Sequence, residues 1–247
     1  MSHVATAEHG VHAAGHHEEE LSFWRKYVFA VDHKVIGLQY MMTALLFLFF
    51  GFTLMMLMRW QLAFPGKPVP AIPFVGLPAF IGVLLLFVSG FNRYLTMLVG
   101  VLFLGIAGLV WYLTSDENLM PGGIMLPEFY NSFGAMHGTI MVFLWVVPLA
   151  VGAFGNYVVP LQIGAPDMAF PKLNAASYWS FFLGGVVMIS SFFAPGSAAN
   201  SGWTSYPPLS DIATVGQTYW LFGMVFLITS SLLGSVNFIT TDRKSVV

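Results

Sequence analysis

This 247-residue chain has the composition of a membrane protein, since 57% of its residues are hydrophobic and 8% are charged. Too few polar side chains remain to cover a water-soluble globule of this length, and the sequence therefore predicts an all-α integral membrane protein. The formal net charge of -2 provides no basic surface for nucleic acid, and the lack of cysteine excludes disulfides, thiolate metal sites and cysteine nucleophiles.

Residues 1–20 form a polar tail rich in histidine and glutamate. Metal capture by these histidines is one hypothesis, but the composition favours a solvated and disordered segment. The tail is not expected to be a secretory signal, because the first apolar run begins only near Val35. Residues 21–247 are expected to form a single membrane domain, which opens with an amphipathic segment whose Trp24 and Tyr27 lie at the membrane interface.

Six apolar runs follow, each near the length of about 20 residues that crosses ~30 Å of hydrocarbon. They lie at about 36–58, 72–90, 94–114, 131–159, 177–194 and 217–241. We therefore predict about six transmembrane helices. Pro73 and Pro78 interrupt the second run, so a re-entrant or interfacial segment is the alternative there.

Positive charges indicate the orientation, because short cytoplasmic loops are enriched in lysine and arginine. With the N-terminus in the cytoplasm and successive loops on alternate sides, Arg59 and Lys67 lie outside. The basic residues on the cytoplasmic side are then Arg25, Lys26, Lys34, Arg93, Lys172, Arg243 and Lys244. This asymmetry predicts a cytoplasmic N-terminus and an even number of spans.

His137 is the only histidine inside an apolar run long enough to cross the membrane. Ionisable side chains are costly in hydrocarbon, so such a residue indicates a function and needs a partner. The small residues Gly134, Ala135 and Gly138 beside it leave room for a planar macrocycle or for the backbone of another helix. The residues alone leave two hypotheses open: ligation of a haem or metal ion, and an interhelical hydrogen bond or proton relay.

A group of polar residues follows the run that contains His137, at the cytoplasmic turn. It consists of Asn156, Gln162, Asp167 and Asn174. A carboxylate at the mouth of a helix bundle can collect protons and pass them to ordered water. The alternative for Asp167 is an ordinary interfacial residue in a proline-rich loop.

The last apolar run carries one polar face, because Ser230, Gly234 and Asn237 recur at helical spacing. Such a face can line a file of water. Hydroxyl groups on membrane helices often bond only their own backbone, so a packing face is the simpler explanation.

Three further polar or aromatic residues lie at the predicted outer side. Arg59 ends the first run, where a long basic side chain can reach the headgroups or bond an acceptor on a buried cofactor. Trp203 and Tyr206 lie in an outer loop and are typical of the aromatic belt at a membrane interface.

Several longer motifs carry a family resemblance. They are VDHKVIGLQY, RWQLAFPG, PEFYNSFGAMHGTIMVF, GNYVVPLQIGAPDMAFPKLN, GWTSYPPLS and SSLLGSVNFITT. Together they resemble subunit I of the haem–copper cytochrome c oxidases, in the order found in that family. The resemblance covers most of the chain outside the N-terminal tail and residues 68–120.

The resemblance implies roles for the residues named above. His137 would be an axial ligand of the low-spin haem a iron, and Arg59 would bond a substituent of that haem. Trp203 and Tyr206 would lie towards the haem propionates. Asp167 would be the entrance of a proton pathway whose water chain is held by Asn156, Asn174, Ser230, Ser231 and Asn237.

The resemblance also implies an activity. The complete subunit would transfer electrons from cytochrome c through haem a to a centre of high-spin haem and copper, where O2 is reduced to water with proton pumping. Its expected partners are oxidase subunits II and III in the cytoplasmic membrane of a bacterial-type cell. A quinol oxidase of the same superfamily and a non-redox ion transporter are the alternatives.

Three features depart from the family pattern. Residues 68–120 are expected to be an inserted helical hairpin that turns at Gly90 to Arg93, within the first part of a twelve-helix bundle. No histidine follows His137, so the ligands of copper, of the high-spin haem and of the second face of haem a are missing, and the fragment alone is predicted to be inactive. Residues 242–247, DRKSVV, can be encoded by the start of a common sequencing adapter and are expected to be an artefact; genomic DNA that encodes them before a stop codon would contradict this.

Overall fold

The computed structural model describes residues 22–87 and 93–245, and it divides into two units that meet between Ala30 and Val31. The predicted disorder of residues 1–20 lies outside the described residues. In the first unit, a single π-helical turn, η1 (Trp24–Val28), brings the aromatic rings of Phe23 and Tyr27 to 5.3 Å between centroids. The Trp24 side chain is exposed, as an interfacial segment requires.

The second unit begins with α1 (His33–Ala63), which packs against α6 and against the helix that carries His137. Asp32 starts it, because its Oδ1 accepts hydrogen bonds from the backbone N–H groups of Lys34 at 2.8 Å and Val35 at 3.2 Å. The 31 residues of α1 extend roughly 46 Å at the usual helical rise. This length exceeds the hydrocarbon core and carries both ends of α1 into the interfaces.

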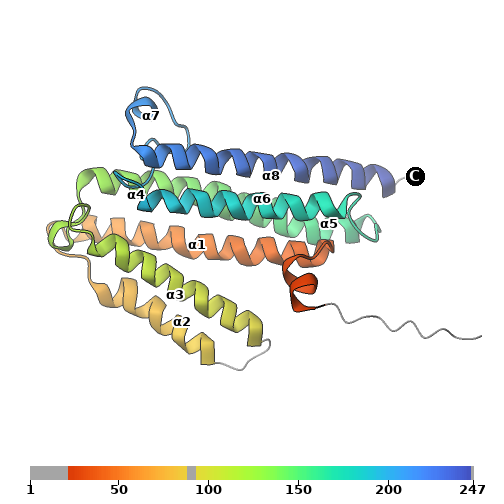
Figure 1. Cartoon of the computed structure of the whole chain (residues 1–247), viewed down its shortest axis with the longest axis horizontal. Helices are drawn as coiled ribbons and strands as arrows, with labels where there is room; N and C mark the ends of the chain where they lie inside the picture. The colour runs from red at the N-terminus through yellow and green to blue at the C-terminus, as the bar shows by residue number, and fades with distance from the viewer. Residues whose placement is uncertain (1–21, 88–92, 246–247) are drawn as a thin grey trace, which may run out of the picture. The chain divides into compact units, whose positions relative to one another are not determined.

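Residues 72–87 and 93–115 form two helical arms that lie side by side (Figure 1). The first arm consists of η2 (Ile72–Gly76) and α2 (Leu77–Phe87), and the second arm is α3 (Arg93–Ser115). A Cβ atom added to Gly82 would lie 2.9 Å from the Gly100 carbonyl oxygen, so the two backbones touch where both residues are glycine. The predicted turn falls mainly on residues 88–92, outside the described part of the chain.

The helix that carries His137 is continuous from Pro127 to Gln162 but changes its winding. It consists of α4 (Pro127–Thr139), the π-helical segments η4 (Ile140–Val146) and η5 (Pro148–Gly155), and α5 (Asn156–Gln162). Pro148 has no N–H and crowds the preceding turn, and the wider π-helical winding is one way to accommodate such a residue.

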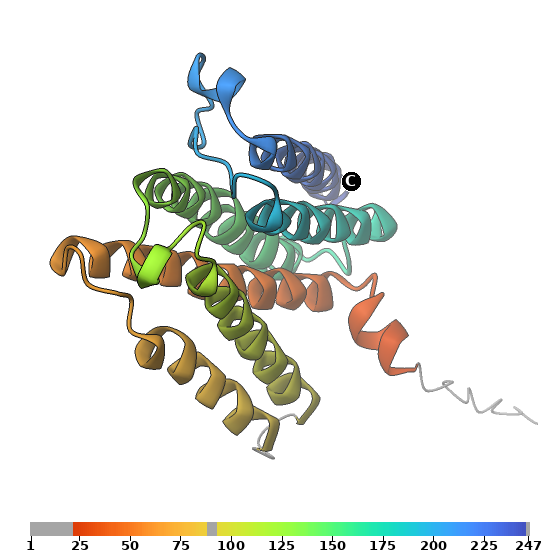
Figure 2. The same ribbon diagram turned by 60° about the vertical axis from the view of Figure 1, so that its left-hand side comes forward.

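The remaining elements are α6 (Pro171–Ser190), the 3-10 turn η6 (Ser191–Phe193), α7 (Leu209–Ile212) and α8 (Val215–Ser245). Helices α6 and α8 lie side by side along their length (Figure 1). They approach closely where a Cβ atom on Gly184 would lie 2.9 Å from the Gly223 carbonyl oxygen. Figure 2 shows α1 between this pair and the arms α2 and α3.

The predicted fold class is confirmed, because every one of the six apolar runs contains helix. Four helices in the described residues are long and apolar enough to cross a membrane: His33–Ala63, Pro127–Gln162, Pro171–Phe193 and Val215–Arg243. The apolar helices of the two arms, Ile72–Phe87 and Val99–Ser115, are shorter. Large apolar side chains are exposed along these helices, as expected of surfaces that face lipid or further helices.

Candidate functional site

His137 lies in the last turn of α4 and faces α1. Its Nδ1–H donates a hydrogen bond to the Gly51 carbonyl oxygen at 2.9 Å. In a neutral imidazole with the proton on Nδ1, Nε2 keeps its lone pair and can bind a metal ion. The interhelical hydrogen bond and metal ligation, which the sequence left as alternatives, are therefore compatible because they use different nitrogens.

Two glycines make this approach of α4 to α1 possible. A Cβ atom on Gly51 would lie 3.0 Å from the Met141 sulfur, and one on Gly134 would lie 3.2 Å from the Met58 terminal methyl carbon. Both positions would be crowded by a larger residue. The small residues that the sequence placed around His137 therefore serve helix packing as well as access to the imidazole.

A cleft of about 450 Å³ opens beside α4. It is lined by Gly134 and Ala135 of α4, by Met58 of α1, and by Asn200 in the loop before α8. Gly134 lies three residues before His137, and residues three apart share a helix face. The cleft and the imidazole are therefore on the same side of α4.

One of the residues that line the cleft has a polar atom that lacks a partner. Asn200 Oδ1 is buried and has no hydrogen bond within the described residues. A buried amide oxygen without a donor is unfavourable, and it indicates a position for a ligand group or an ordered water. His137 does not itself line the cleft, but its available Nε2, its small neighbours on α4 and this nearby acceptor are compatible with a planar macrocycle that has a polar edge.

The loop that lines the cleft is fastened to the start of α8. Gln217 is buried; its Oε1 accepts a hydrogen bond from the Ser201 hydroxyl at 2.5 Å, and its Nε2 donates to the Ser205 hydroxyl at 3.1 Å. Further along α8, Trp220 Nε1 donates to the hydroxyl of Thr139 at 3.2 Å, and Thr139 lies two residues after His137. These bonds hold the loop that lines the cleft, and α8 itself, against α4.

The three residues expected at the outer side are placed differently. Trp203 lies beside α4, with its Cδ1 atom 4.0 Å from the Cβ position of Gly138 and its ring 6.3 Å from that of Phe143. The Tyr206 side chain is 73% exposed, and that of Arg59 is also exposed. Only Trp203 is therefore brought next to the helix of His137 in the described part of the chain.

A second polar site lies deeper in the bundle, between α1, α6 and α8. The Tyr40 hydroxyl is 2.8 Å from the Ser177 hydroxyl oxygen and 3.2 Å from that of Ser230. The two serines also donate to each other's backbone carbonyls, at 2.8 and 2.7 Å. Three buried hydroxyl groups from three helices thus form one hydrogen-bonded cluster.

Sequence reasoning identified Ser230 in this cluster but missed Tyr40 and Ser177. A signal was present, because Tyr40 follows His33 by seven residues and Ser177 follows Asn174 by three, both helical spacings. Ser231 is exposed, and its backbone carbonyl accepts a hydrogen bond from Ser235. The structure therefore does not bring Ser231 into the cluster.

The loop that contains Asp167 is clamped to the end of α8. Asn237 is fully buried and binds the backbone of Phe170 twice, accepting from its N–H at 2.9 Å and donating to its carbonyl at 3.3 Å. The Thr241 hydroxyl oxygen accepts from the Ala169 N–H at 2.9 Å. Asp167 itself is half-buried, and its carboxylate accepts from the N–H of Met168.

Two buried amides flank this loop in the sequence: Asn156 at the start of α5 and Asn174 in the first turn of α6. Asn156 donates to the Gly152 carbonyl at 2.6 Å, and its backbone carbonyl accepts from His33 Nδ1–H at 2.9 Å. The atoms Asn156 Oδ1 and Asn174 Nδ2 are buried without a partner within the residues described. One acceptor and one donor are thus available to ordered water.

Comparison with known proteins identifies the family. The model of the family "Cytochrome C and Quinol oxidase polypeptide I" matches residues 35–245. Cytochrome c oxidase subunit 1 of Thermostichus vulcanus is 38% identical over 232 residues, which are 94% of this chain and 32% of the relative. The protein of the same name from Synechocystis sp. is 38% identical over 223 residues, 90% of this chain and 30% of the relative.

A third relative, cytochrome c oxidase subunit 1 of Corynebacterium efficiens, is 45% identical over 117 residues, or 46% of this chain and 20% of the relative. The chain therefore spans about a third of the length of the first two relatives. On the match over residues 35–245, the chain belongs to the family of cytochrome c and quinol oxidase subunit I proteins.

Proposed function

We propose that the complete subunit to which these residues belong is the catalytic subunit of a terminal respiratory oxidase. It would transfer electrons from cytochrome c through a low-spin haem a to a haem–copper centre that reduces O2 to water, coupled to proton pumping. The relatives' name, cytochrome c oxidase subunit 1, supports cytochrome c over quinol as the donor. Oxidase subunits II and III would be its partners in the cytoplasmic membrane, with the N-terminus in the cytoplasm.

The observation that carries the proposal is the geometry of His137. Its Nδ1–H bond to the Gly51 carbonyl fixes the tautomer and the plane of the ring, and such a bond makes the other nitrogen a better ligand. When bound, the haem supplies one-electron redox chemistry. The residues that would hold it are His137 at the iron, with Trp203 beside Gly138, Asn200 at the cleft and Arg59 on the outer side.

The polar residues of the inner half would conduct protons. Asp167 would collect them at the cytoplasmic mouth, and Asn237 would keep its loop in place. The unpartnered amide atoms of Asn156 and Asn174 would bind water that leads to the hydroxyl cluster of Tyr40, Ser177 and Ser230. Each hydroxyl can receive one proton and release another, so that no charge accumulates in the low-dielectric interior.

The copper ion and the second haem need ligands beyond those in these residues. No histidine follows His137 in the 247 residues. No cluster of three or more histidine, cysteine, aspartate or glutamate side chains occurs within residues 22–87 and 93–245. We therefore propose that the residues of this chain bind one face of haem a and conduct protons, and that oxygen is reduced by the complete subunit.

Substitution of His137 by alanine in the purified full-length oxidase tests this function. We expect the absorption of the low-spin haem to be lost, because the iron loses an axial ligand. His33→Gln is the matched control. His33 also donates to a backbone carbonyl of another helix at 2.9 Å, but it is the first residue of α1 and lies far along that helix from Gly51. An unchanged spectrum in His137→Ala would contradict the ligand assignment, and a folded wild-type protein without haem would favour an ion transporter.

A further inference from the structure

Two hydrogen bonds between side chains join α1 to α6 in parallel. The first links Tyr40 to Ser177 at 2.8 Å and belongs to the hydroxyl cluster. The second links the Thr43 hydroxyl oxygen to the Tyr178 hydroxyl at 3.1 Å. Thr43 lies three residues beyond Tyr40, or about 4.5 Å further along the helix axis. The second pair is outside the predicted water chain and calls for its own explanation.

Tyr40 occupies a slot that fits its ring closely. The ring stacks on Phe181, with centroids 5.2 Å apart and planes inclined by 24°. A Cβ atom on Gly152 would lie 2.5 Å from the Tyr40 Cδ1 atom, so only glycine leaves room for the ring there. The remaining close aromatic neighbour is Tyr178, whose ring meets that of Tyr40 edge-on at 5.2 Å and 78°.

The ring of Tyr178 is itself held in place. It is buried, and its centroid lies 5.5 Å from that of the Trp179 ring and 6.4 Å from that of the Phe182 ring. Its hydroxyl is tied to Thr43, on the same helix as Tyr40. Thr43 therefore fixes Tyr178, and Tyr178 forms one wall of the slot that orients Tyr40.

We propose that Tyr178, anchored by Thr43, positions the hydroxyl of Tyr40 for proton transfer through Ser177 and Ser230. This rests on the proton-conducting part of the proposed function. The Tyr40 and Ser230 hydroxyl oxygens are 3.2 Å apart, longer than the usual distance of about 2.5–3.0 Å for hydroxyl pairs, so a small tilt of the ring breaks this weak bond. A displacement of about 1 Å in a reacting group can slow a reaction by roughly 10²-fold.

Substitution of Thr43 in the full-length oxidase tests the proposal. Thr43→Val removes the hydroxyl with little change in volume, and we expect proton uptake during turnover to slow several-fold. Tyr178→Phe should slow it equally, and the double variant should be no slower than either single one, because both remove the same bond. Thr43→Ser should restore the rate. Thr53→Val is the control, since the hydroxyl of Thr53 binds the carbonyl of Phe49 in its own helix.

A second measurement reports on Tyr40 directly. The infrared C–O stretching band of Tyr40, identified by its loss in Tyr40→Phe, should shift in Thr43→Val and stay unchanged in Thr53→Val. The low-spin haem spectrum should be the same in all these variants. Normal proton uptake and an unshifted Tyr40 band in Thr43→Val, with slow uptake in Tyr40→Phe, would overturn the positioning role alone. Normal uptake in Tyr40→Phe would overturn the proton pathway and this inference with it.

Discussion

Two histidines show how surroundings determine the use of the same side chain. His33 and His137 each donate Nδ1–H to a carbonyl oxygen of another helix at 2.9 Å. His33 is buried at the start of α1, where the bond joins it to the backbone of Asn156. His137 is half-buried beside small residues and shares a helix face with a cleft. The hydrogen bond alone does not separate a structural histidine from a proposed ligand; the space beside it does.

The adjacent serines of α8 offer a matched pair of substitutions. Ser230→Ala removes a buried hydroxyl that bonds Tyr40 and the Ser177 carbonyl, and we expect the oxidase to lose roughly 1–3 kcal/mol of stability because buried partners remain unsatisfied. Ser231 is exposed, and its loss should change stability by no more than about 0.5 kcal/mol. Chemical unfolding in detergent and proton-uptake rates would compare the two; equal effects would contradict the cluster.

Asp167 permits a second prediction at this scale. Asp167→Asn removes the carboxylate but retains an oxygen that can accept the hydrogen bond of the Met168 N–H. We expect proton pumping to be lost or slowed while the low-spin haem spectrum stays unchanged. Proton release measured per electron in reconstituted vesicles would check this. Normal pumping at normal turnover would exclude Asp167 as the entrance.

At the level of secondary-structure elements, pairs of glycines determine which helices pack against each other. Gly82 and Gly100 bring the backbones of the two arms into contact, and Gly184 and Gly223 do the same for α6 and α8. Hydrophobicity drives little association between helices in lipid, so close packing and hydrogen bonds have to supply it. Each pair joins residues distant in sequence, and sequence analysis singled out none of them as a contact.

The arms provide a controlled test of this packing. Gly100→Ala places a Cβ atom 2.8 Å from the Gly82 carbonyl oxygen, and we expect a loss of about 1–3 kcal/mol from overpacking. Gly105→Ala on the same helix meets no atom within 4 Å and should be neutral or stabilising. Thermal denaturation of the full-length oxidase would separate the two variants. Similar losses in both variants would contradict the role of the contact between the arms at Gly100.

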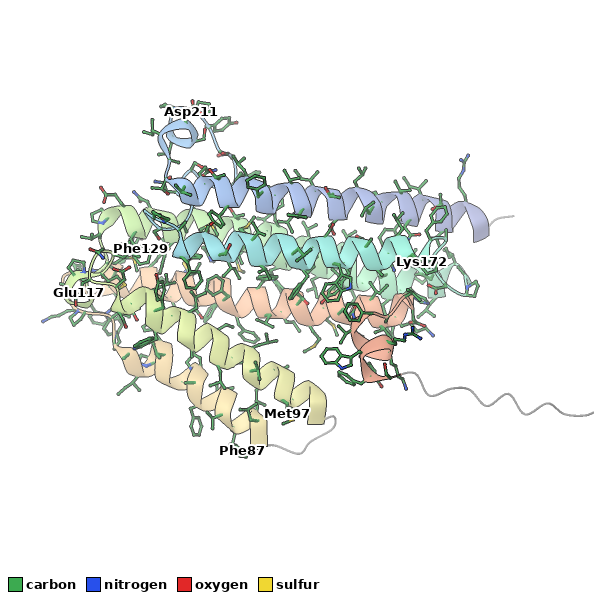
Figure 3. The ribbon with its side chains drawn as sticks, in the orientation of Figure 1. Phe87, Met97, Glu117, Phe129, Lys172 and Asp211 are labelled. Atoms are coloured by element: carbon green, nitrogen blue, oxygen red, sulfur yellow. The ribbon has the colours of Figure 1, made fainter. Side chains whose placement is uncertain are left out.

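Charge is distributed unevenly along the whole second unit. Figure 3 places Lys172 at one end of the long helices and Glu117 and Asp211 at the other end. From the positive-inside rule we predict that the end with Lys172 faces the cytoplasm. Exposed apolar side chains cover the long helices between these ends, as expected of a membrane-embedded surface.

The lack of cysteine in the chain makes the orientation directly testable. Lys67, in the loop after α1, and Lys172, in the first turn of α6, are exposed residues that we predict to lie on opposite sides of the membrane. In cells that express the full-length subunit, Lys67→Cys should react with a membrane-impermeant thiol reagent, and Lys172→Cys should react only after permeabilisation. The subunit without an added cysteine gives the background. The reverse pattern would invert the predicted topology.

The sequence by itself determined the all-helical membrane class, the position of the apolar runs and the family, because hydropathy and local motifs are properties of contiguous residues. It also marked His137, Asp167 and Ser230 as polar residues that need partners. It could not identify Gly51 as the acceptor for His137, join Tyr40 to Ser177 and Ser230, or leave Ser231 outside that cluster. These depend on the rotation and approach of helices distant in sequence, which packing at glycine contacts and interhelical hydrogen bonds decide only in the folded structure.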